Sequence, residues 1–346
     1  MLKNYVLVAL RNFRKFKTYS FINIFGLAIG LACCILILLH IYDELNFDRF
    51  HEKADRLFRV IQVRSGSQGE QHLAYTMGPF GPALVNEFPE VEASARLFQG
   101  WRLTVKREAA GPTGQIVRKN FFTDASFFDL FDFQLLAGDR KTALSTPGSV
   151  VLTEPMAKQL FGDEEPLGKS LQIEAEDFPE FVQTAFTVTG VLRDIPHTSH
   201  LNFDLLISQS TLDRFADVHG WFTDWNNTIV ITYVLLRNPF NQANLEAKLA
   251  QFNLKHRGEE AARNRFYLQP LNDIHFGSAE IGSEYNIREG QVGYVYVFAA
   301  IALFLAAIAC INYMNLATAR SMKRAKEVGL RKVVGANRSS APIAAK

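Results

Sequence analysis

The sequence predicts an α+β membrane protein in which two transmembrane helices flank a large mixed α/β domain. Residues 21–41 contain no Asp, Glu, Lys or Arg, and neither does the stretch between Glu289 and Arg320. Each stretch is long enough for the roughly 20 apolar residues that a helix needs to cross a bilayer. The region between them alternates short strand-like and helix-like patterns. The chain of 346 residues is 48% hydrophobic and 21% charged, and this ordinary average conceals the two apolar stretches.

Residues 1–19 are predicted to form an amphipathic basic segment on the cytoplasmic face of the membrane. Apolar residues at positions 7, 10, 13 and 16 alternate with five basic ones, Lys3, Arg11, Arg14, Lys15 and Lys17. This pattern is typical of a helix that lies on the inner leaflet and contacts membrane lipid.

A first transmembrane helix is predicted at residues 20–42. A cleaved signal peptide is the alternative, but the apolar run exceeds the roughly 7 to 15 residues of such a peptide and no small-x-small cleavage site follows it. Basic residues precede this helix and the acidic Asp43 and Glu44 follow it, so the N-terminus is expected in the cytoplasm. Gly26 and Gly30, four positions apart, weakly indicate close helix packing.

Residues 43–290 are predicted to form the outer domain. Segments rich in β-branched and aromatic residues predict strands at 57–64, 95–105, 149–153, 169–175, 185–193, 203–208, 228–236 and 265–270. Helices are predicted at 79–88, 154–161, 209–216 and 242–257, the last with Asn241 as its cap. The three cysteines, Cys33, Cys34 and Cys310, lie in the apolar stretches, so the outer domain must be held by its core and not by disulfides.

A second transmembrane helix is predicted at residues 291–317, followed by a short basic helix at 318–338 and a tail at 339–346. Seven basic residues between Arg320 and Arg338 place this end in the cytoplasm. Glu327 and Arg331 are four apart, a favourable helical pair, and Gly335 can end the helix in a left-handed conformation. The alternative is that this basic patch does not dock a partner and only sets the membrane topology of the chain or binds anionic lipid.

The residues from Asn315 to Ala336 carry the pattern NxxxARSxxRxxEVGxRKxxGA, which resembles the signature of the MacB/FtsX-like ABC transporter permease family. The resemblance implies a coupling helix that docks on a separate ATPase subunit. The docking residues that it implies are Arg320, Arg324, Glu327, Gly329, Arg331, Lys332 and Gly335.

Three further pieces resemble the periplasmic core domain of the same family: DELNFDRFHEKADRLFRV, LTEPMAKQLFGDEEPLGKSLQI and GVLRDIPHTSHLNFDLLIS. The resemblance implies a porter-like β/α subdomain with an inserted second subdomain, and a multi-pass protein of the cell inner membrane. In the first piece, six residues are expected to pack the exit of the first span onto the base of the domain: Asp48, Phe50, His51, Arg56, Phe58 and Arg59.

Several sequence patterns resemble nucleotide-binding, metal-binding or catalytic motifs but do not match them. The stretch GDEEPLGKS at 162–170 has five residues between its glycines where a nucleotide-binding P-loop has four, and it is better explained as a helix end that turns into a strand. His197 and His200 with Asp194 and Asp204 form a poor zinc pattern, because they lie in a loop without a cysteine. No Gly-x-Ser-x-Gly elbow is present. We therefore expect no catalytic, cofactor-binding or metal-binding residue and no enzyme activity of the chain alone.

The function that the resemblance implies is that of a permease subunit, which couples ATP hydrolysis by a partner to movement of a periplasmic domain for efflux, lipoprotein handling or related work. A dimer, or pairing with a second permease half, is expected. The net charge of +2 argues against nucleic-acid binding. A two-span sensor with a ligand-binding outer domain remains an alternative, and a membrane-anchored enzyme is a weaker one. Family permeases have further spans after the coupling helix, so the chain is expected to be a fragment or a truncated form.

Overall fold

The structure is a computed structural model that describes residues 17–66, 69–100, 102–107, 114–175, 184–259, 264–282 and 287–333. It divides into two compact units. One is a helical unit that contains helices α2 (Lys17–Leu45) and α9 (Val292–Val333), and the other is a sheet domain at Asn46–Gln291. The predicted amphipathic segment at 1–19 lies almost entirely outside the described residues.

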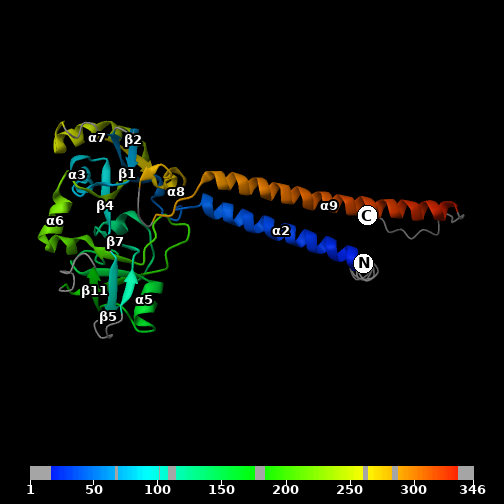
Figure 1. Ribbon diagram of the computed structural model, residues 1–346, viewed down its shortest axis with the longest axis horizontal. Helices are drawn as coiled ribbons and strands as arrows, with labels where there is room; N and C mark the ends of the chain where they lie inside the picture. The colour runs from blue at the N-terminus through cyan, green and yellow to red at the C-terminus, as the bar shows by residue number, and fades with distance from the viewer. Residues whose placement is uncertain are drawn as a thin grey trace. The chain divides into compact units, whose positions relative to one another are not determined.

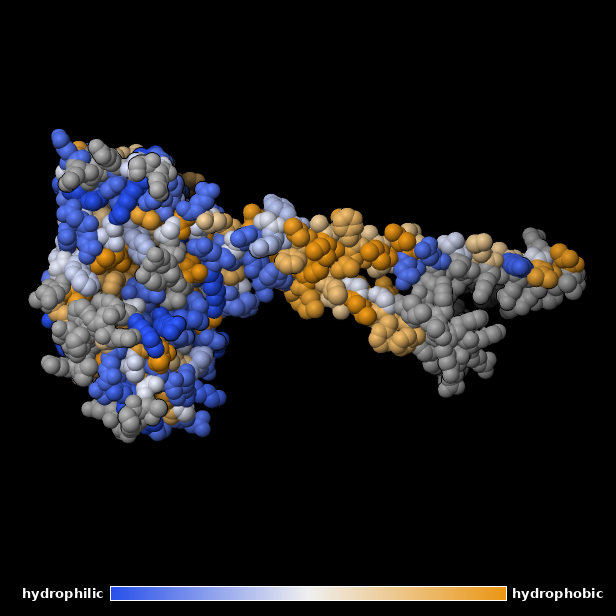
Figure 2. Space-filling model, viewed as in Figure 1, coloured by the Kyte–Doolittle hydropathy of each residue, from blue (hydrophilic) through white to orange (hydrophobic). Residues whose placement is uncertain are grey.

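In the helical unit, α2 and α9 run side by side (Figure 1). Within them, Ile24–Leu45 and Val292–Asn315 are long and apolar enough to cross a membrane, by length and composition. Only 6% of each apolar window is buried. Figure 2 shows hydrophobic side chains gathered on the surface of these helices. Aliphatic side chains such as Leu36, which is 67% exposed, are stable in contact with lipid and unfavourable in water.

The two glycines of α2 do not bring a neighbouring helix close. A Cβ atom added at Gly26 or Gly30 would meet nothing within 4 Å. Gly30 instead lines an apolar groove of about 520 Å³ between α2 and α9, together with Cys34 and Cys310. The indication of close helix packing at these glycines is therefore wrong for this pair of helices.

Helix α9 is continuous through the expected boundary between the second span and the basic helix. It runs from Val292 to Val333 without a break at residues 317 and 318. The reason is local, because the sequence around this boundary contains neither glycine nor proline and favours helix. The described residues of the basic segment thus form the C-terminal part of α9, while Gly335 lies outside the described residues.

The sheet domain contains fifteen strands within the described residues, and they form one sheet. They are β1 (Leu57–Gly66), β2 (Gly69–Leu73), β3 (Thr76–Met77), β4 (Val91–Gln99), β5 (Leu103–Arg107), β6 (Gln115–Val117), β7 (Asn120–Thr123), β8 (Leu135–Gly138), β9 (Ser149–Thr153), β10 (Ser170–Ala175), β11 (Phe186–Leu192), β12 (Leu205–Ser208), β13 (Thr228–Leu236), β14 (Asn264–Pro270) and β15 (Ile281–Gly282). The order is β15-β2-β1-β13-β4-β7-β12-β9-β11-β10-β5-β6, with β14 beside β1, β3 beside β13 and β8 beside β11.

Helices and 3-10 turns cover this sheet. They are η1 (Ala54–Arg56), α3 (Phe80–Glu87), α4 (Phe127–Leu130), α5 (Glu154–Phe161), η3 (Gln209–Arg214), α6 (Ala216–Thr223), η4 (Pro239–Asn241), α7 (Gln242–Arg257), η6 (Leu271–Asp273) and α8 (Ile274–Gly277). Helices α3 and α7 pack at the end of the sheet that holds β1 and β14, whereas α5 packs beside β9 and β11 (Figure 1).

The central core of the domain lies over β4, β7, β9, β12 and β13. Phenylalanines from α4 and its flanking residues fill it, and Phe127 contacts the rings of Phe131, Phe133 and Phe203 at centroid distances of 4.9, 5.9 and 6.1 Å. Ala54 from η1 and Ile274 from α8 belong to the same core. The segments that begin and end the domain are therefore packed into its centre.

Most predicted elements agree with the structure, and four have the predicted bounds: the strands at 149–153 and 228–236 and the helices at 154–161 and 242–257. The single strand predicted at 95–105 is wrong, because β4 ends at Gln99 and β5 begins at Leu103. The helix predicted at 209–216 is also wrong. Its residues form the 3-10 turn η3, and α6 begins only at Ala216.

Two local predictions concern helix ends. Asn241 makes no side-chain capping hydrogen bond to α7; instead, the side chain of Asn238 accepts one from the Phe240 amide at the start of η4. The explanation of the 162–170 stretch is confirmed. Gly162 ends α5 with φ 62°, Gly168 turns the chain with φ 76°, and β10 follows at Ser170.

Candidate functional site: the coupling segment and the two ends of the sheet domain

The predicted docking residues that the structure describes all lie on the C-terminal part of α9. Positions 320, 324, 327 and 331 are separated by four, three and four residues, so they fall on one face of an α-helix. Position 332 falls to the side of that face, and Gly329 falls on the opposite side. The helix therefore gathers Arg320, Arg324, Glu327 and Arg331 into one stripe and leaves two of the predicted residues outside it.

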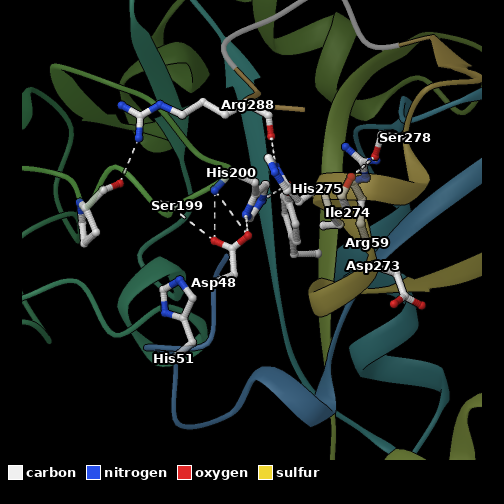
Figure 3. A network of polar contacts seen from close by, with 12 residues as sticks. Asp48, His51, Arg59, Ser199, His200, Asp273, Ile274, His275, Ser278 and Arg288 are labelled. Carbon is white, nitrogen blue, oxygen red and sulfur yellow. Dashed lines mark hydrogen bonds and ion pairs between the residues drawn. The ribbon is translucent and has the colours of Figure 1, made fainter. Parts of the chain in front are cut away.

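A second cluster lies where the chain enters and leaves the sheet domain (Figure 3). We call residues 46–56 the incoming segment, residues 271–291 the outgoing segment, and residues 196–202 the bridging loop. Polar side chains from all three meet in the interior.

Asp48 anchors the incoming segment to the bridging loop. Its backbone amide donates to the Thr198 carbonyl at 2.8 Å, and its carboxylate accepts from the His200 amide at 3.1 Å and from the Ser199 hydroxyl at 3.4 Å. His200 Nδ1 lies 2.9 Å from Asp48 Oδ2. Asp48 adopts φ 57°, a left-handed conformation that costs a non-glycine residue about 1 kcal/mol or more. Its four polar contacts offset that cost.

The other side of His200 continues the network into the sheet. Its Nε2 lies 2.8 Å from the Tyr233 hydroxyl on β13, and burial raises the pKa of Tyr233, so the phenol stays protonated. Arg59 on β1 donates to Gln269 Oε1 at 2.7 Å and to the Ser278 hydroxyl at 2.7 Å. Burial lowers the pKa of Arg59, an effect that the nearby Tyr233 opposes. The interior thus holds the Asp48 carboxylate and the Arg59 guanidinium, each hydrogen-bonded to polar groups from other segments.

His51 is a buried neutral imidazole next to this network. Its ring packs edge-on against Phe131 and Phe133, and its Nδ1 accepts from the Asp132 amide at 2.9 Å. Desolvation lowers the pKa of His51 to about 4, although the charge of Asp48 opposes the shift. His51 therefore carries no charge at neutral pH.

The outgoing segment holds the bridging loop from the opposite side. The Arg288 amide donates to the His200 carbonyl at 2.8 Å, and its guanidinium donates to the Pro196 carbonyl at 2.9 Å and to Asn202 Oδ1 at 3.2 Å. His275 Nδ1 donates to the Arg288 carbonyl at 3.1 Å, and the His275 ring stacks on Phe47 with a centroid distance of 3.4 Å. The incoming and outgoing segments are thereby joined both directly and through the loop.

The histidines and aspartates of the 194–204 region do not form a metal site. His200 is fully buried and engaged as described, whereas His197 and Asp194 are exposed, and burial raises the pKa of Asp204. Within the part of the chain that the structure describes, no group of three or more His, Cys, Asp or Glu side chains could hold a metal ion.

That six residues of the first motif piece pack the exit of the first span onto the base of the domain stays a prediction. Four of them, Asp48, His51, Phe58 and Arg59, are buried. Arg56 pairs with Glu92 at 2.8 Å. The sequence did not indicate that Asp48 contacts His200 or that Arg59 contacts Gln269 and Ser278, because these partners lie far along the chain and only the tertiary fold brings them together.

Comparison with known proteins agrees with this architecture. The family of MacB-like periplasmic core domains matches residues 20–252. A domain of a protein named as a permease from Porphyromonas gingivalis is similar in structure, with TM-score 0.52 and 23% identity over 64% of this chain and 92% of that one. No curated protein matches the chain.

Two other solved structures are similar at lower scores. The periplasmic region of MacB from Actinobacillus actinomycetemcomitans gives a TM-score of 0.42 at 16% identity, over 62% of this chain and 90% of that one. The extracellular domain of the noncanonic ABC-type transporter YknZ from Gram-positive bacteria gives a TM-score of 0.43 at 12% identity, over 62% of this chain and 99% of that one.

A mixed α/β domain that is flanked in the sequence by two apolar helices is the architecture of a membrane protein with one large outer domain. The family match covers more than half of the chain, so the protein belongs to the family of MacB-like periplasmic core domains. It is accordingly an inner-membrane protein with a periplasmic domain.

Proposed function

We propose that this chain is the permease subunit of an ABC transporter, which receives movement from a separate ATPase and passes it to the periplasmic domain. The ATPase docks in the cytoplasm on the stripe formed by Arg320, Arg324, Glu327 and Arg331. The N-terminus lies on the same cytoplasmic side, since basic residues precede the first span and follow the second.

The observation that carries the proposal is the continuity of α9. One helix connects the stripe to the end of the second apolar window without a break. A helix is stiff along its axis, so a displacement of the stripe moves the other end of the helix. A chain that only anchored an outer domain would not need a charged, regularly spaced helix face beyond the membrane.

The docking test compares charge reversals on and off the stripe. The tagged full chain is expressed in its own host and extracted in mild detergent. The ATP hydrolysis activity that co-purifies with it is measured, and the polypeptide responsible is identified. We expect an ATPase with the natural chain and its loss with Glu327→Arg and with Arg331→Glu. Lys326→Glu is the matched control, because position 326 lies on a different side of the same helix.

The double variant Glu327→Arg with Arg331→Glu separates docking from helix stability. It restores the internal pair four residues apart but presents the wrong charge at each position. Absence of the ATPase from the double variant supports docking through these side chains. Full recovery with the double variant, or loss with Lys326→Glu, would contradict it.

A further inference from the structure

The buried contacts at the two ends of the sheet domain join three segments that are distant in the chain. Asp48 belongs to the incoming segment, His200 to the bridging loop and Arg288 to the outgoing segment (Figure 3). Asp48 and His200 are fully buried. The loop is thus bound to the residues that follow α2 and to those that precede α9.

We propose that Asp48, His200 and Arg288 are positioning residues of a clamp that carries displacement of the membrane helices through the bridging loop to strand β12. The clamp consists of these three residues with Phe47 and His275. It rests on the proposed function, because the displacement that it carries comes from the ATPase.

The destination of the movement follows from the topology. The bridging loop ends two residues before β12, which lies in the middle of the sheet between β7 and β9. Asp204, just before β12, makes backbone hydrogen bonds to the segments of both neighbouring strands, β7 and β9. Its amide donates to the Lys119 carbonyl at 2.7 Å, and its carbonyl accepts from the Thr153 amide at 2.9 Å. A shift of the loop therefore reaches the centre of the domain and not an edge.

The chemistry of the clamp favours a geometric role over simple stabilisation. A buried contact between polar or charged side chains stabilises a fold no better than well-packed apolar side chains of similar size, but it holds its partners in one arrangement. Asp48 in addition keeps a left-handed backbone conformation. The arrangement fixes the distance between the incoming segment and the loop, which is what transmission requires.

Hydrogen exchange in the full chain tests the clamp without any ATPase. Asp48→Asn keeps the side-chain shape and removes the charge. Arg288→Gln removes two loop contacts at a half-buried position, where folding is less at risk. The loss of a hydrogen bond to a charged group changes the equilibrium constant for local opening by about tenfold. Each variant is therefore expected to raise the hydrogen-exchange rate about tenfold or more in the bridging loop. The same increase is expected in the outgoing segment for Asp48→Asn and in the incoming segment for Arg288→Gln.

The matched control is Asp124→Asn, which breaks the Asp124 to Arg96 ion pair at 2.6 Å elsewhere in the same domain. It is expected to leave exchange in the bridging loop and the outgoing segment unchanged. If Asp48→Asn left the outgoing segment unaffected, or if Asp124→Asn loosened it equally, the three segments would not act as one clamp.

The second arm uses the complex with the ATPase in lipid nanodiscs, with and without a non-hydrolysable ATP analogue. In the natural chain the nucleotide is expected to change exchange in residues 46–56, 196–202 and 205–208. In Asp48→Asn the nucleotide effect on 46–56 remains and that on 196–208 is lost. A purely structural defect raises exchange equally with and without nucleotide, so the difference isolates transmission.

The two proposals fail in different ways. If no ATPase binds the natural chain, the proposed docking function fails. If the ATPase binds and the nucleotide effect at 196–208 is absent in the natural chain or persists in Asp48→Asn, docking stands and the clamp is overturned.

Discussion

At the scale of single residues, the sheet domain combines buried charged groups with one buried neutral imidazole, that of His51. Asp48 and Arg59 are fully buried charged groups, and each is surrounded by donors or acceptors from other segments. His51 is different, because its surroundings are mostly aromatic and favour the neutral ring. The environment of one histidine therefore makes the stability of the domain depend on pH.

We expect the free energy of unfolding to fall as the pH drops below about 6.5 and to level off near pH 4 as far as His51 is concerned. In the unfolded chain His51 binds a proton near its ordinary pKa of 6.5, whereas in the folded domain it does so only at about 4. Between these values the unfolded state binds more protons, so acidification destabilises the fold by roughly 3 kcal/mol in total.

Unfolding of the full chain in detergent, followed by tryptophan fluorescence at several pH values, measures this slope. His51→Asn keeps an acceptor for the Asp132 amide and should flatten the slope between pH 6.5 and 4. His219→Asn, at an exposed position, should leave it unchanged. Equal slopes in the natural chain and in His51→Asn would show that another group causes the pH dependence.

At the scale of elements, α9 combines an apolar part and a basic part in one helix. Its first part is apolar enough for a membrane span, and its last part bears the charged stripe. Because no glycine or proline interrupts it near residues 317 and 318, the register between span and stripe is set by helix geometry alone. In the proposed function, transmission along α9 thus depends on an intact helix at this boundary.

Thr318→Pro tests this dependence. Proline removes a backbone hydrogen bond and clashes with the preceding turn, at a cost of about 3 kcal/mol or more, so it should kink α9 between span and stripe. We expect membrane insertion to remain, ATPase binding to persist, and the nucleotide effect on the periplasmic domain to be lost. Thr318→Ala is the control. An unchanged nucleotide effect in Thr318→Pro would show that movement reaches the domain by another route.

At the scale of the whole molecule, the sheet domain is organised around an aromatic core that also receives its two ends. The phenylalanines of α4 and its flanks pack against β7, β12 and β13, while Ala54 and Ile274 insert from the incoming and outgoing segments. Loosening this core should therefore affect both the stability of the domain and the clamp.

Phe127→Ala is expected to lower the free energy of unfolding by roughly 3 to 5 kcal/mol, because it leaves a cavity among Phe131, Phe133 and Phe203. Denaturant unfolding of the full chain in detergent measures the change. Phe240→Ala removes a ring that is 89% exposed and should change it by no more than about 0.5 kcal/mol. A small effect of Phe127→Ala would mean that the core refills the cavity.

The sequence by itself determined the two apolar helices, the intervening mixed domain and several element bounds. These features are local, since uncharged length defines a span and short-range patterns define β9, β13, α5 and α7. The sequence also determined the family, because the motifs that carry the resemblance are contiguous stretches of residues that need no tertiary structure to be recognised. The break between β4 and β5 and the 3-10 turn η3 were missed, since tertiary packing outweighs propensity over such short stretches.

Only the tertiary structure decided the candidate clamp. Asp48 and His200 are 152 residues apart, and nothing in local patterning indicates that one accepts from the other. Arg288 and Tyr233 join them because the sheet order places β13 and both ends of the domain around the same core. Contacts between distant residues depend on the global arrangement of strands, and therefore the contacts among these segments are visible only in the fold.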